Sequence, residues 1–134
     1  MSESDVLKWL LPNVLLNVHA AQLDEHGGLT GIRDEGALSS ALNRPQNHFG
    51  YGETNVFMLA ALYAVGIIKN HPFVDGNKRT GFLAAFIFLD VNGYNLITLE
   101  ADAVLMTQRL AASDIDEVQF AFWLEQNAKP NSTA

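Results

Sequence analysis

The chain has 134 residues and a mass of 14.7 kDa, the usual size of a single domain with one hydrophobic core. It contains no cysteine, which excludes disulfide bonds and thiolate metal sites and fits a reducing, cytoplasmic compartment. The formal net charge of −7 argues against direct binding to nucleic acid or to an anionic membrane, and no apolar stretch is long enough to span a bilayer.

Helical periodicity dominates the chain. Apolar residues recur at helical spacing in five segments, and the fifth segment divides at Ser113. We therefore expect helices over residues 6–22, 34–42, 54–70, 77–92, 100–111 and 114–127.

Prolines and capping residues indicate where these helices begin and end. Pro12 interrupts the first segment and favours a helix start at that residue. Asp34 is the expected N-cap of the second helix, which we expect to end before Pro45. Ser113 is the expected N-cap of the last helix, and Asp116 three residues later resembles the partner residue of a capping box.

The helix expected over residues 77–92 is apolar nearly all round, and such a helix belongs at the centre of a domain. Convincing strand patterns are missing, but residues 46–53 are rich in glycine and aromatic side chains. The sequence thus predicts an all-α fold, a compact helical bundle with a short flap or hairpin loop before the turn at residues 70–80. We expect one domain over residues 1–128 and a flexible tail over residues 129–134.

The turn at residues 70–80 carries the features of an anion site. Lys69, Lys78 and Arg79 are three of the eight cationic residues and lie close together in an otherwise acidic chain. The start of a helix presents free amide N–H groups and partial positive charge, which attract phosphate. Gly76 allows the backbone to approach a ligand closely, and Asn77 can either fix the loop or donate a hydrogen bond to a phosphate oxygen.

Two further residues of the turn suggest group transfer to a protein hydroxyl. His71 can accept a proton near neutral pH and is the candidate general base. Asp75 is a lone carboxylate of the kind that holds Mg²⁺ together with the phosphates of a bound nucleotide. We expect the Phe73 side chain to pack in the hydrophobic core and anchor the turn there. The competing interpretation is a purely structural turn, in which His71 caps a helix and the cations are solvated.

Residues 71–79 resemble the signature of the Fic/Doc family, His-x-Phe-x-Asp/Glu-Gly-Asn-x-Arg, at every fixed position. Lys78 occupies a position where the Fic branch usually has glycine, which matches the death-on-curing (Doc) branch. Residues 31–38, followed by Arg44 and Pro45, also look like that branch. The resemblance covers most of the chain and implies a Fic/Doc-like helical fold.

The resemblance also implies roles for individual residues. His71 would be the base, Asp75 would hold Mg²⁺, and Gly76, Asn77, Lys78 and Arg79 would hold the phosphates of ATP. Doc-type members are implied to be protein kinases that phosphorylate elongation factor Tu and arrest translation, whereas Fic-type members transfer AMP. The second arginine and the inhibitory motif that are common in the Fic branch are missing, which favours phosphate transfer and control by a separate partner.

That partner is expected to be a small antitoxin whose C-terminal segment occupies a groove near the turn. Phe49, Tyr51 and the helix at residues 6–22 are the expected lining of this groove, and residues 46–53 are the expected flap for the target protein. Three hypotheses therefore stand: a toxin kinase, a protein adenylyltransferase that uses the same turn, and a non-catalytic helical binding module.

Overall fold

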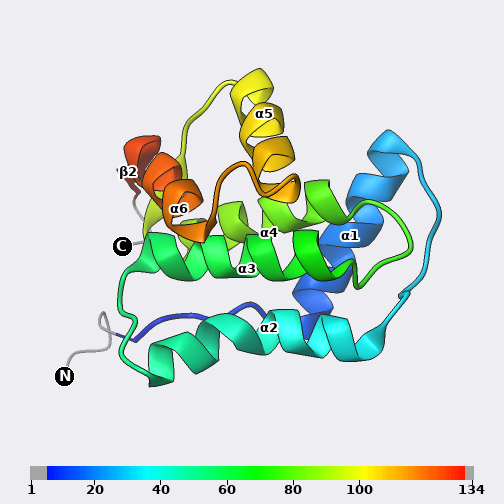
Figure 1. Ribbon diagram of the computed structural model, residues 1–134, viewed down its shortest axis with the longest axis horizontal. Helices are drawn as coiled ribbons and strands as arrows, with labels where there is room; N and C mark the ends of the chain where they lie inside the picture. The colour runs from blue at the N-terminus through cyan, green and yellow to red at the C-terminus, as the bar shows by residue number, and fades with distance from the viewer. Residues whose placement is uncertain (1–5, 132–134) are drawn as a thin grey trace.

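The computed structural model describes residues 6–131. Two short strands and six α-helices make up this part of the chain, which confirms the mostly helical fold class. Figure 1 shows them in the order α1 (Pro12–His26), α2 (Glu35–Gly50), α3 (Val56–Asn70), α4 (Asn77–Val91), β1 (Tyr94–Leu96), α5 (Glu100–Ala111), α6 (Glu117–Gln126) and β2 (Ala128–Pro130). No helix within residues 6–131 is both long and apolar enough to cross a bilayer.

The central helix is α3 and not α4, so the prediction for residues 77–92 was wrong on this point. Every residue from Leu59 to Ile68 is buried, because α2, α4, α5 and α6 all pack around α3 (Figure 1). In α4, by contrast, Phe82 and Ile87 are only half-buried and Phe86 is 37% exposed. An apolar face of α4 is therefore left uncovered beside the turn that precedes it.

Helix α2 ends eight residues later than the sequence predicted, because it runs through Pro45 to Gly50. Pro45 lacks only one backbone N–H, and its ring is buried in line with Leu38, Ala41 and Leu42 against the core. Packing of this apolar face outweighs the lost hydrogen bond. The expected flap or hairpin at residues 46–53 is consequently wrong, since residues 46–50 are helical and only a short turn follows.

Four other helices confirm or correct the starts that the sequence predicted. Helix α1 begins at Pro12 as predicted, and α5 has the predicted bounds. Asn55 caps α3 by accepting hydrogen bonds from the amides of Phe57 and Met58. Asp116 is the N-cap of α6 and forms a full capping box with Gln119. The prediction that Ser113 caps this helix was therefore wrong.

The C-terminal segment forms a strand where a tail was predicted. Strand β2 pairs antiparallel with β1, and Leu96 lies opposite Ala128. Lys129 and Pro130 therefore belong to the folded domain, and the prediction of a tail from residue 129 was wrong for them. Residues 1–5 and 132–134 lie outside the described part of the chain. A single pair of three-residue strands carries no periodicity that the sequence could reveal.

The fold brings two distant loops to the same end of the molecule. The α1–α2 loop and the α3–α4 turn lie side by side in Figure 1, and backbone hydrogen bonds join them. The α3–α4 turn contains the residues that the sequence marked as functional. The N-terminal third of the chain thus holds the candidate site in place.

Candidate functional site

His71 ends α3 in a left-handed conformation, with φ 48° and ψ 59°. This backbone geometry is unusual for a residue with a side chain, and neighbouring contacts must maintain it. Arg33 from the α1–α2 loop supplies them: its Nε donates to the His71 carbonyl at 2.6 Å and its guanidinium donates to the Asn70 carbonyl at 2.7 Å. The His71 side chain itself is exposed and lines a cleft.

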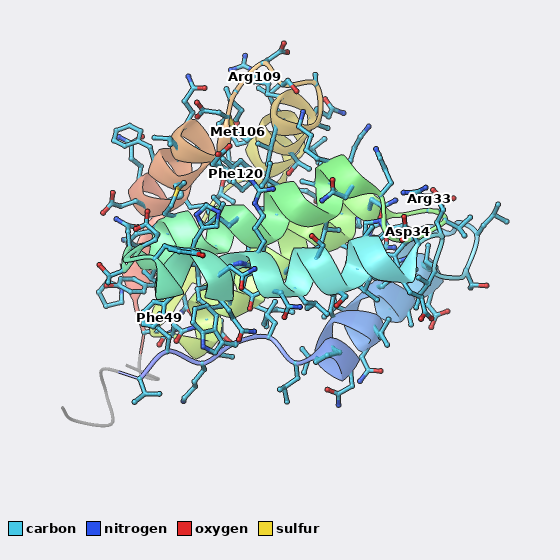
Figure 2. All side chains as sticks on the ribbon, turned by 60° about the horizontal axis from the view of Figure 1, so that its bottom comes forward. Arg33, Asp34, Phe49, Met106, Arg109 and Phe120 are labelled. Atoms are coloured by element: carbon cyan, nitrogen blue, oxygen red, sulfur yellow. The ribbon has the colours of Figure 1, made fainter. Side chains whose placement is uncertain are left out.

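Backbone pairing reinforces this contact between the two loops. The Pro72 carbonyl accepts from the amides of Arg33 at 2.7 Å and Asp34 at 3.1 Å, and Val74 N donates to the Gly31 carbonyl at 3.0 Å. Figure 2 shows Arg33 and Asp34 at the end of α2 that meets the turn. The resemblance in residues 31–38 therefore has a structural meaning, because this stretch holds the turn.

The Asn77 side chain stabilises the turn through hydrogen bonds to its backbone. Its Oδ1 accepts from Phe73 N at 3.0 Å and its Nδ2 donates to the Phe73 carbonyl at 2.9 Å. The side chain is only 8% exposed, and both of its polar atoms bond to the backbone of Phe73. Of the two roles that the sequence left open for Asn77, this geometry matches the one that fixes the loop.

Helix α1 contacts the turn through a histidine that the sequence analysis left without a role. His19 Nε2 lies 2.8 Å from the Asp75 carbonyl, and its ring stacks on Phe73 with centroids 3.7 Å apart and planes 9° from parallel. Both His19 and Phe73 are buried. The available signal was the position of His19 on the inward face of α1, four residues after buried Leu15.

Asp75 points its carboxylate toward the α1–α2 loop and the start of α4. One oxygen accepts from Leu29 N at 3.2 Å and the other from Gly76 N at 3.1 Å. The residue is exposed at the edge of the cleft. Each carboxylate oxygen has a second lone pair, so this oriented group remains able to bind a divalent cation.

The start of α4 has the features expected of an anion site. Gly76 is its N-cap, with φ 77°, and no side chain caps the first turn. The first amides of a helix have no partner within it, so these N–H groups are available to an acceptor. Lys78 and Arg79 are exposed in the same first turn, where their charges oppose the helix dipole in the absence of an anion.

A cleft of about 820 Å³ opens beside this helix start. The turn, α1, α4 and α5 form its walls. His71, Asp75, Gly76, Asn77, Lys78 and Arg79 all line it, whereas buried Phe73 lies beneath. The fold thus gathers six of the seven candidate residues around one space of a size that suits a small-molecule ligand.

The lining of the groove differs in part from the prediction. Helix α1 does contribute, through residues such as Val18 and Glu25, but Phe49 and Tyr51 do not line the cleft. Figure 2 shows Phe49 at the opposite end of α2 from Arg33, and its ring packs edge-on against Trp9. The prolongation of α2 carries Phe49 and Tyr51 away from the turn.

No cluster of three or more metal-ligating side chains is present within residues 6–131. Asp75 is accordingly not part of such a cluster in this part of the chain.

Comparison with known proteins agrees with these features. A model of the Fic/DOC family matches residues 9–89, which contain α1 to α3, the turn and all but the last two residues of α4. The chain is 35% identical over 88 residues to the protein kinase doc of Escherichia phage P1, covering 65% of this chain and 70% of that protein.

A second relative is the toxin Doc of Mycolicibacterium smegmatis, with 41% identity over 73 residues. This match covers 52% of the present chain and 55% of the relative, so the chain spans just over half of that protein. The matched region, the complete signature and the names of both relatives agree with one another. The chain belongs to the Fic/Doc family and, within it, to the death-on-curing branch.

Proposed function

We propose that the chain is the toxin of a toxin–antitoxin pair and acts as a protein kinase. It transfers a phosphoryl group from ATP to a hydroxyl of a translation factor, with elongation factor Tu as the first candidate. One observation carries the proposal: an exposed histidine and an uncapped helix start face the same cleft. The relative named protein kinase doc supports the choice of reaction.

The residues that line the cleft have separate roles in the proposed reaction. The ATP phosphates bind at the start of α4, where the amide groups, Lys78 and Arg79 offset their charge. The hydroxyl oxygen of the target attacks the γ-phosphorus, and the bond from that phosphorus to the β–γ bridging oxygen breaks. ADP leaves, and His71 takes the hydroxyl proton.

Asp75 would hold the Mg²⁺ that accompanies ATP, and the bound ion would help to neutralise the phosphate charge. The carboxylate is oriented for this role by Leu29 and Gly76. Arg33 and Asn77 contribute by keeping the turn rigid, because donors held in fixed positions stabilise developing charge most effectively.

The antitoxin is proposed to cover the same cleft. Beyond the turn, half-buried Phe82 and Leu83 and exposed Val104 give the cleft an apolar stretch between α4 and α5. An amphipathic helix from a small partner fits a groove of this kind. Expression with and without the neighbouring reading frame tests the idea, and the absence of any co-purifying small protein would contradict it.

The proposed reaction is tested by intact-mass measurement of purified elongation factor Tu after incubation with the protein and MgATP. A gain of one phosphate is expected. A gain of AMP would replace the kinase with the adenylyltransferase hypothesis. The His71→Ala variant is expected to lose transfer by at least about a hundredfold, the usual contribution of a general base.

The matched control is His48→Ala, which removes an exposed histidine of α2 that lies outside the cleft. This variant should transfer phosphate as the wild type does. Growth arrest that persists in folded His71→Ala would support the non-catalytic binding module instead.

A further inference from the structure

Gln22 is a buried polar residue that the family signature does not contain. It lies on α1, is 3% exposed, and lines the cleft together with His71 and Arg79. Its Nε2 atom is buried without a hydrogen-bond partner. Buried amide groups are nearly always paired, so an unpaired one requires an explanation.

The side-chain amide of Gln22 lies directly against the start of α4. A Cβ atom on Gly76 would overlap Gln22 Nε2 and would lie 3.0 Å from its Cδ. Gly76 is the N-cap of α4, and no side chain caps this helix. An unpaired donor group thus lies beside a helix start whose own amide donors are uncapped.

His19 on α1 has a structural role that Gln22 does not share. His19, three residues earlier on the same helix face, bonds to the Asp75 carbonyl and stacks on Phe73. Gln22 makes no comparable contact with the turn through Nε2. Leucine at this position would fill similar space without burying an unpaired donor, so stability alone does not account for glutamine.

We infer that Gln22 is a phosphate-binding residue, whose Nε2 donates to an oxygen of the polyphosphate bound at the start of α4. Rotation about the Cγ–Cδ bond, a broad torsion, moves Nε2 away from Gly76 and toward the cleft that Gln22 lines, and Oε1 moves in the opposite direction. The donor then joins the amides of the first turn, and the ligand gains a contact from a second helix. This inference rests on the proposed function only in taking a nucleotide polyphosphate as the ligand.

The chemistry of the surrounding groups favours an anion over a neutral ligand. The first turn of α4 supplies N–H groups, and Lys78 and Arg79 add two full positive charges at the same place. A neutral amide adds no charge but fixes the direction of one phosphate oxygen. Gln22 thereby sets where the phosphate chain lies relative to His71.

Titration calorimetry with inorganic tripolyphosphate and with MgATP tests the inference on the intact protein. Gln22→Leu is expected to weaken binding of both ligands by about tenfold, the usual effect of losing one hydrogen bond to a charged group. Gln22→Glu should weaken it further because it adds a negative charge. Gln108→Leu makes the same change on the α5 wall of the cleft and should alter binding less than about twofold.

Urea unfolding of the same variants separates a ligand contact from a structural contact. Gln22→Leu should be at least as stable as the wild type, because it removes an unpaired buried donor. Wild-type affinity for tripolyphosphate in Gln22→Leu would overturn the inference and leave the kinase proposal intact. Weakened binding by Gln22→Leu together with a wild type that transfers no phosphate would overturn the kinase proposal alone. A wild type that binds no polyphosphate would overturn both.

Discussion

Gly81 lies where α4 crosses α3, one turn after the candidate phosphate site. A Cβ atom at this position would lie 2.6 Å from Ile68 Cγ1 and 3.1 Å from the Ala64 carbonyl oxygen. Ile68 is 1% exposed and Ala64 is fully buried, so neither group has space to move away. The two helices can approach this closely only because Gly81 has no side chain.

Two opposing effects determine the stability of Gly81→Ala. Alanine is favoured over glycine within a helix by about 1 kcal/mol. Overpacking a close-packed interior costs about 1–3 kcal/mol, and a contact of 2.6 Å with a buried side chain belongs in the upper part of that range. We therefore expect Gly81→Ala to lower the free energy of unfolding by about 1–2 kcal/mol.

The matched control is Gly50→Ala, which makes the same change at the last residue of α2. A Cβ atom there would meet nothing within 4 Å. Helix propensity then acts alone, and stability should rise by about 0.5 kcal/mol. Urea unfolding followed by tryptophan fluorescence measures both variants. Gly81→Ala at or above wild-type stability would refute the close approach of α3 and α4.

Two further predictions concern contacts that hold the core and the turn. Tyr63 is fully buried and its hydroxyl accepts from Leu10 N at 3.1 Å, so Tyr63→Phe should cost about 1–3 kcal/mol by leaving that amide unpaired. Burial raises the pKa of Tyr63 above its ordinary value of 10.0, so the wild type should lose stability as the pH rises above 10.0. Tyr63→Phe should lose less over the same range in urea titrations, and an equal loss would contradict this cause. Arg33→Gln removes the bonds to the carbonyl groups of Asn70 and His71, so phosphate transfer should fall about tenfold while the free energy of unfolding falls by only about 1 kcal/mol. Arg109→Gln, on α5, is the control in the same transfer and unfolding assays, and equal losses in the two variants would contradict a positioning role for Arg33.

Local signals in the sequence predicted the elements whose causes are local. Pro12 and Asp34 mark the starts of α1 and α2 because each acts within its own first turn. Pro45 misled the prediction because its effect depends on what its ring packs against, and burial against the core keeps α2 helical. The pairing of β1 with β2 depends on residues more than thirty positions apart, and periodicity carries no information on such contacts.

In the candidate site, too, the sequence predicted the residues with local signals and missed those that depend on distant contacts. The nine-residue signature, residues 71–79, identified six of the residues that line the cleft, because a helix start, a glycine and two cations are local features. The supporting residues were missed because they come from distant segments. Arg33, His19 and Gln22 reach the turn from α1 and the loop after it, and only the folded chain shows what they contact.

The short pairing of β1 with β2 has a consequence for how the cleft can vary between related proteins. It joins the two ends of residues 97–127, so that α5 and α6 form a closed excursion of the chain, which packs against α3 and α4. The family match ends at residue 89, before this excursion begins, yet α5 supplies one wall of the cleft. Insertions or replacements within the excursion can reshape that wall while the sequence of the α3–α4 turn stays unchanged. The wall and the turn can therefore diverge separately in this fold, because they lie on different segments of the chain.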